Sequence, residues 1–258
     1  MVQPRIQQYD QLRVDIYPTN EEMGEAAATY LIEKLHLLLG EKPTANVIFA
    51  TGNSMLRFYA GLRRHADEVN WRKVRIFHMD EYVGITDQHP ASFRRYLHEK
   101  IIDFLEPLAF FEVVGDAPDP HKECERYAEL LQTFPADICC LGYGENGHLA
   151  FNDPPFADFQ DPSLVKIVNL AEASRRQQVG EGHFSTLAAV PQQAITLTIP
   201  ALVNVRFILG IVPERRKAEA VKTALTGAIT EDCPGSYLRT LSQARLFLDE
   251  ESASSLEA

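Results

Sequence analysis

The side chains best suited to chemistry follow a short apolar run in the middle of the chain. Residues 141–155, LGYGENGHLAFNDPP, combine a glycine-rich turn, one histidine and one carboxylate. The run at residues 137–142 is bounded by turn residues and predicts a buried strand. The glycines of the turn, Gly144 among them, allow a sharp bend and leave backbone amides facing a ligand. His148 then lies just past the strand end, where open α/β sheets place their ligands.

A histidine on such a turn is often only a polar loop residue, but a second segment adds two adjacent carboxylates. Residues 77–84, FHMDEYVG, end a predicted buried strand with Asp80 and Glu81. Successive strand residues point in different directions, so one carboxylate could face a pocket while the other orients the loop. A carboxylate in an apolar pocket has a raised pKa, which suits a general base acting on a carbon acid. The alternative is a strand-end turn with solvated acids.

Two further segments could bind an anion. Residues 50–55, ATGNSM, join a predicted strand to a predicted helix, and amides and hydroxyls at a helix N-terminus favour a phosphate. The same turn could serve only for helix capping, and it lacks the Gly-Lys-Ser/Thr of a P-loop. Residues 212–218, VPERRKA, begin another helix. There Arg215, Arg216 or Lys217 could meet a phosphate, or form a solvated basic face.

The elements that must position these residues alternate along the chain. Strands are predicted at residues 46–50, 74–79, 137–142, 194–199, 206–212 and 244–248. Helices are predicted from the capping box at Thr19 to a C-cap at Gly40, and at residues 54–65, 92–104 and 214–225. Alternation of this kind predicts βαβ units. We expect one α/β domain, residues 1–258, with an open, mostly parallel, doubly wound (Rossmann-like) sheet, helices on both faces and a lid at about residues 156–184.

Composition limits the partners. The formal net charge is −11 and the pI is near 5.2, which argues against nucleic-acid or membrane surfaces, since both are negatively charged. The N-terminus has no apolar signal region and no run reaches membrane-span length, so a cytoplasmic protein is expected. The four cysteines have no zinc-site or disulfide spacing and are expected to be buried, reduced thiols.

Taken together, the motifs ATGNSM, FHMDEYVGITDQHPASFRRYL, LGYGENGHLAFNDPP and VPERRKAEAV resemble the glucosamine-6-phosphate deaminase/isomerase family, within the group that includes 6-phosphogluconolactonases. The similarity runs from about residue 51 to about residue 249. The resemblance implies that Asp80 moves a proton between C2 and C1 of the open-chain sugar and that His148 opens the pyranose ring. It implies deamination through an enolamine, a sugar phosphate as the small-molecule partner, and no cofactor. His78, Asp80 and His148 could form a metal site, but the chain shows no local ligand pattern and the reaction requires no metal, so none is expected.

The same resemblance supplies the expected site. The expected catalytic residues are Asp80, Glu81, Asn146, His148 and Asp153. The expected substrate-binding residues are Thr51, Gly52, Asn53, Ser54, Gly144, Arg175, Arg176 and Lys217.

The chain departs from the family pattern around the ring-opening histidine. Asn146 stands where the best-known members have Asp, and Asp153 stands where they have Glu. Asn146 can orient the imidazole but carries no full charge to stabilise an imidazolium. The family's phosphate-binding arginine is hard to align, and Arg175 and Arg176 are both candidates for it.

Two other functions fit parts of the pattern. A lactonase would use His148 to activate water, but lactonases of the group carry an Asp-Glu-Arg type segment where this chain has Asp-Glu-Tyr. A sugar-phosphate sensor would keep the phosphate turn without needing both Asp80 and His148, and no helix-turn-helix pattern precedes Asp15. The sequence leaves open the gluco or galacto epimer and the oligomeric state, a homo-oligomer included.

Overall fold

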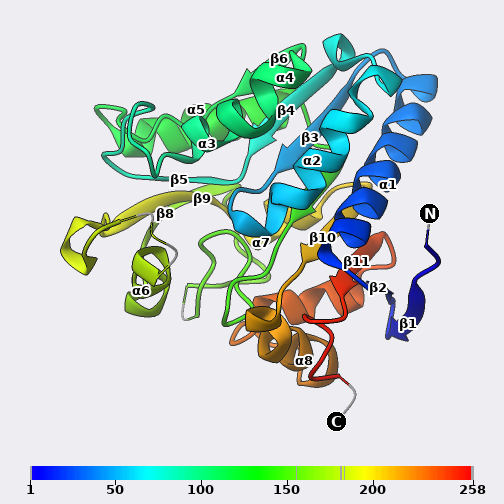
Figure 1. Cartoon of the computed structure of the whole chain (residues 1–258). Coiled ribbons are helices and arrows are strands. Elements are labelled where there is room, and N and C mark those ends of the chain that lie inside the picture. The colour runs from blue at the N-terminus through cyan, green and yellow to red at the C-terminus, as the bar shows by residue number, and fades with distance from the viewer. Residues whose placement is uncertain (1, 155, 181, 183, 257–258) are drawn as a thin grey trace.

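An eight-stranded, mostly parallel sheet forms the centre of the structure (Figure 1). The structure is a computed structural model that describes residues 2–154, 156–180, 182 and 184–256. The strands of this sheet, in spatial order, are β1 (Arg5–Tyr9), β2 (Leu12–Tyr17), β11 (Ala244–Asp249), β10 (Phe207–Val212), β7 (Ile138–Leu141), β3 (Ala45–Phe49), β4 (Val74–His78) and β6 (Ala109–Phe111). Only the β1–β2 pair is antiparallel among them. The central strands read as continuous apolar runs because a parallel sheet is buried on both faces.

Helices cover both faces of this sheet. The helices are α1 (Asn20–Glu41), α2 (Leu56–Arg64), α3 (Phe93–Leu97), α4 (Asp103–Leu105), α5 (Pro120–Thr133), α6 (Glu172–Gly180), α7 (Ile199–Val203) and α8 (Ala218–Thr226). The ring of Phe49 in β3 contacts that of Phe58 in α2, and the ring of Phe77 in β4 contacts that of Tyr127 in α5. Phe49 is in register with His78, the neighbour of Phe77, so the two aromatic contacts lie on opposite faces. The predicted doubly wound α/β fold is confirmed.

Two predicted helices differ from the observed ones at their ends or in their interior. Thr19 caps α1 as predicted, with its hydroxyl accepting from the Glu22 amide at 3.2 Å. However, α1 continues past Gly40 and is capped at Lys42, because the Lys42 amide donates to the Leu38 carbonyl. The predicted helix at residues 92–104 is observed as α3, a π-helical turn (His98–Ile102) and α4 in succession.

One predicted strand belongs to a different sheet. Residues 194–199 were expected in the main sheet, but β9 (Gln193–Leu197) pairs antiparallel with both β5 (Asp80–Tyr82) and β8 (Val165–Asn169) in a separate three-stranded sheet. The small sheet contributes to two apolar clusters, since Ile195 and Leu197 of β9 belong to the main core and Ala194 to a smaller cluster with Tyr82 and Phe151. A strand pattern records burial but not which strands will pair. Of the expected lid, residues 156–184, positions 181 and 183 lie outside the described residues.

All four cysteines are buried and free of disulfides. Among the described residues, none of the helices is long and apolar enough to cross a membrane.

Candidate active site

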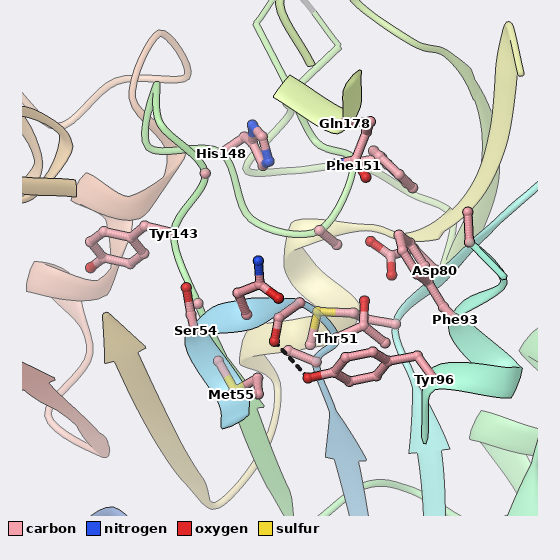
Figure 2. A pocket seen from close by; sticks show the side chains of 18 of the residues that line it. Thr51, Ser54, Met55, Asp80, Phe93, Tyr96, Tyr143, His148, Phe151 and Gln178 are labelled. Carbon is pink, nitrogen blue, oxygen red and sulfur yellow. Dashed lines mark hydrogen bonds between the residues drawn. The ribbon is translucent and has the colours of Figure 1, made fainter. Parts of the chain in front are cut away.

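The chemistry-bearing segments meet because they follow four neighbouring strands. β10, β7, β3 and β4 are adjacent and parallel, so the segments after their carboxyl ends share one edge of the sheet. A pocket opens at that edge (Figure 2). Its described lining comprises Ala50, Thr51, Gly52, Asn53, Ser54, Met55, Met79, Asp80, Pro90, Ala91, Ser92, Phe93, Tyr96, Gly142, Tyr143, Gly144, His148, Ala150, Phe151, Gln178, Arg216 and Lys217.

Asp80, the first residue of β5, points its carboxylate into this pocket (Figure 2). The residue is only 6% exposed, and its Oδ1 has no hydrogen-bond partner among the described residues. Burial raises the pKa of Asp80 well above its usual value, and the neighbouring charge of Glu81 adds to the effect. A carboxylate that is poorly solvated and unbonded is a stronger base than one in water. This arrangement suits proton abstraction.

Glu81 faces away from the pocket and is saturated with hydrogen bonds. Its carboxylate accepts from the Ser92 hydroxyl at 2.8 Å and from the amides of Phe93 and Arg94 at 3.1 and 3.0 Å. Burial raises the pKa of Glu81, and these hydrogen bonds partly oppose that rise. Because Ser92 is the N-cap of α3 and Phe93 lines the pocket, Glu81 holds one pocket wall in place.

His148 lies on a different side of the pocket from Asp80 (Figure 2). Its Nδ1 lies 2.8 Å from Asp153 Oδ1 and 2.7 Å from Asn146 Oδ1. The Asn146 amide in turn donates to Asp153 Oδ1 at 2.8 Å. The described residues give Nε2 of His148 no hydrogen bond, so that nitrogen can exchange a proton with a ligand. Asn146 and Asp153 are not among the lining residues; both contact Nδ1 of His148.

Gly144 is in close contact with the His148 ring. A Cβ on Gly144 would lie 2.1 Å from His148 Cε1, so the ring would have to shift to admit one. The imidazole therefore packs directly over the backbone of the turn. Gly147, with φ +82°, supplies the left-handed conformation that lets the chain reverse before His148.

The turn after β3 has the geometry of an anion site. Gly52 has φ +101° and precedes a short helical turn that leads into α2. The Tyr96 hydroxyl donates to the Gly52 carbonyl at 2.7 Å and fixes the turn (Figure 2). The amides of Asn53 and Ser54 begin the helix and have no intrahelical acceptor. Lys217 also lines the pocket and is 2% exposed.

The two arginines expected at the phosphate lie elsewhere. Arg175 donates to the carbonyls of Leu187 and Val190 at 2.6 and 3.1 Å. Arg176 extends into solvent, 70% exposed, and pairs with Glu172 one helical turn away. Neither lines the pocket.

Sequence reasoning missed several residues that do line it. Gln178 enters from α6, and Phe93, Tyr96 and Phe151 form apolar or aromatic walls (Figure 2). Phe151 and Tyr96 belong to motifs singled out in the sequence. Strand and helix patterns do not predict which side chains near those motifs point into a pocket.

Metal ligands do not gather at this site. Within the described ranges, no group of three or more His, Cys, Asp or Glu side chains could hold a metal ion. His78, two residues before Asp80, is fully buried, and its Nε2 accepts from the Val113 amide at 2.7 Å. Burial lowers the pKa of His78 to about 3, so it is a neutral core residue.

The chain is similar to proteins of one known family. Residues 18–247 match the family model of glucosamine-6-phosphate isomerases/6-phosphogluconolactonase. Over 209 residues, 80% of this chain and 79% of the relative, the chain is 35% identical to a glucosamine-6-phosphate deaminase of Exiguobacterium sibiricum. Over 243 residues, 94% of this chain and 88% of the relative, it is 33% identical to a glucosamine-6-phosphate deaminase of Bacillus thuringiensis.

Solved structures give the same result. One described as a monomeric glucosamine-6-phosphate deaminase superposes with a TM-score of 0.86 at 30% identity, covering 94% of this chain and 99% of that one. A 6-phosphogluconolactonase from Trypanosoma brucei superposes with a TM-score of 0.75 at 17% identity, covering 98% of this chain and 100% of that one. The second likeness shows a shared fold only.

Proposed function

The chain belongs to the family of glucosamine-6-phosphate isomerases and 6-phosphogluconolactonases, and from that membership we propose that it converts glucosamine 6-phosphate and water into fructose 6-phosphate and ammonia. The observation that carries the proposal is one pocket with two proton-transfer groups of different kinds. Asp80 presents a buried carboxylate oxygen without a partner, and His148 presents an imidazole whose Nδ1 contacts a carboxylate.

His148 acts first, on the closed sugar. Its Nε2 takes the proton from the anomeric hydroxyl and passes it to the ring oxygen as the C1–O5 bond breaks, which leaves an aldehyde at C1. The passing imidazolium is stabilised by the Asp153 carboxylate at Nδ1 and is oriented by Asn146. The charge that Asn146 lacks is therefore provided by Asp153.

Asp80 then moves the proton that isomerises the open chain. It takes the proton from C2, the electron pair forms the C1=C2 bond, and O1 takes up a proton to give the enolamine. Asp80 returns its proton to C1, which leaves an imine at C2. Water adds to this carbon and ammonia leaves, so the product is the 2-ketose. One carboxylate can serve both carbons because C1 and C2 are bonded neighbours.

The first experiment measures ammonia and fructose 6-phosphate together after incubation of the purified protein with glucosamine 6-phosphate. Equimolar products are expected. Asp80→Asn is nearly isosteric and removes only the base, so kcat should fall by about 10²–10⁴-fold. Hydrolysis of 6-phosphogluconolactone without ammonia release would show instead that the chain is a lactonase.

A further inference from the structure

A second hollow lies at the opposite edge of the main sheet from the active site. Its described walls come from α1, β2 and the starts of β10 and β11, which lie side by side (Figure 1). Phe207 and Ala244 in these walls are the first residues of β10 and β11, whereas the active site follows the carboxyl ends of its strands. The hollow has a volume of about 360 Å³, which suits a small molecule or ion.

Two arginines at this hollow share one carboxylate. Arg13 in β2 and Arg245 in β11 are in register on neighbouring parallel strands, where like charges repel each other. Nε of Arg13 donates to Asp15 Oδ1 at 2.8 Å, and Nε of Arg245 donates to Asp15 Oδ2 at 2.7 Å. Asp15 is fully buried, and one cation is enough to balance its charge. The second arginine therefore leaves an excess of positive charge.

Lys34 of α1 adds a third cation. Its ammonium nitrogen lies 4.5 Å from the centre of the Tyr30 ring, and the Arg245 guanidinium lies at the same distance from that centre. The ring thus holds both cations beside the hollow. The partner of Lys34 is Glu33, at 2.7 Å, whose side chain is 65% exposed, so this ion pair is largely screened by water. The hollow keeps a net positive charge in a chain whose formal net charge is −11.

The two arginines also keep donors for a ligand. Arg245 contacts Asp15 through Nε and Nη2, and Arg13 does so through Nε. Within the described structure, Nη1 of Arg245 and both Nη groups of Arg13 make no hydrogen bond. A guanidinium presents its N–H groups as a planar fork that matches the oxygens of a phosphate or carboxylate. Because Asp15 already fixes both guanidinium groups, a ligand would have to immobilise them little further.

On these grounds we propose that the hollow is a second anion site, which binds a small phosphate-bearing ligand through Arg13, Lys34 and Arg245. A phosphate fits three cationic side chains better than a carboxylate does, because it carries up to two negative charges and three acceptor oxygens. Free phosphate and the phosphate group of a small monoester share this chemistry. The proposal does not depend on the reaction proposed for the active site.

Equilibrium dialysis with radiolabelled inorganic phosphate tests the site in the full chain. Arg13→Met should weaken the binding at this site by about 10- to 100-fold, and it should fold because Asp15 keeps its bonds from Arg245. Lys34→Met should weaken the same binding. Glu33→Gln should strengthen it, because that change removes a negative charge beside Lys34, a gain that a purely structural role of these residues would not produce.

The matched control is Arg72→Met. Arg72 is an exposed arginine that pairs with a carboxylate, Glu106, and it lines neither hollow. Its variant should bind phosphate as wild type does. In Arg13→Met, kcat and KM for glucosamine 6-phosphate should equal those of wild type, which would show that the phosphate was lost from the second hollow and not from the active site.

The source of the phosphate group is decided by competition. Glycerol 3-phosphate that displaces the Arg13-dependent label at lower concentration than unlabelled phosphate would identify a monoester as the better ligand, and the reverse order would identify free phosphate. Equal phosphate binding by wild type and a folded Arg13→Met would overturn the proposal. Equal loss in Arg72→Met, or a rise in KM that parallels the loss of phosphate, would overturn it as well.

Discussion

The contact between His148 and Asp153 leads to a quantitative prediction for Asp153→Asn. The two side chains are 14% and 2% exposed and their Nδ1 and Oδ1 atoms are 2.8 Å apart. Asn146, the other partner of Nδ1, is neutral. Asp153 is therefore the negative charge next to this nitrogen in the described structure, and its replacement by an isosteric amide removes the charge while keeping the shape.

The magnitude follows from the strength of an interaction with a charged partner at this distance. Interactions of this kind contribute about 1.5–3 kcal/mol, and solvent screens this one little at this degree of burial. Each 1.36 kcal/mol corresponds to a tenfold change in rate. If the ion pair stabilises the imidazolium formed during ring opening, Asp153→Asn should slow that step by roughly 10- to 150-fold.

The assay must show which step was slowed. We would measure kcat with glucosamine 6-phosphate carrying hydrogen or deuterium at C2. When ring opening limits turnover, cleavage of the C2–H bond no longer does, so the isotope effect on kcat should fall toward one in Asp153→Asn. It should not fall in Asp80→Asn, because that substitution slows C2–H cleavage itself.

A charge-swapped double variant is the matched control. Asn146→Asp combined with Asp153→Asn returns one carboxylate and one amide to Nδ1 in exchanged positions, and it should recover much of the lost rate. Wild-type kcat in a correctly folded Asp153→Asn, or an isotope effect that increases, would refute the proposed role of Asp153 in ring opening.

Three further predictions concern the base, the turn and the loop anchor. Because the pKa of Asp80 is raised, kcat/KM in a pH–rate profile should decline with falling pH at values well above the usual aspartate range. A raised carboxyl pKa also means that the ionised form destabilises the fold at higher pH. Asp80→Asn should therefore increase the free energy of unfolding at neutral pH by about 1 kcal/mol in urea titrations, and an unchanged value would contradict this. Gly144→Ala places a Cβ against the His148 ring, and displacement of the ring should lower kcat by about 100-fold. The circular dichroism spectrum should be unchanged. A near-normal kcat would show that the ring can move without loss of function. Ser92→Ala removes both the α3 N-cap and a donor to Glu81. It should cost about 1–2 kcal/mol of stability in urea unfolding, and a neutral result would show that the backbone donors to Glu81 suffice.

The motifs after the strands were accessible from sequence because their signals are local. Apolar runs bounded by glycine and polar residues predicted β3, β4, β7 and β10, and the alternation with helices predicted a parallel sheet. Parallel strands deliver their carboxyl ends to one edge, and Asp80 and His148 lie in the segments that follow β4 and β7. The pocket lining contains both.

Short edge elements were not accessible in the same way. β5 and β6 have three residues each, too few for a period to stand out. The separate sheet of β5, β9 and β8 contributes residues to both apolar clusters, and these clusters are assembled from segments far apart in the chain.

The sequence by itself determined the set of reactive groups and the strand ends that carry them. Residue types and local hydrophobic periods can both be recognised in short stretches of consecutive residues. What only the tertiary structure decided is which groups touch. Asp153 contacts His148, and Arg216 lines the pocket whereas Arg175 bonds to the carbonyls of Leu187 and Val190. Such contacts depend on the packing of whole elements, and a one-dimensional pattern does not record the rotation of an element about its own axis.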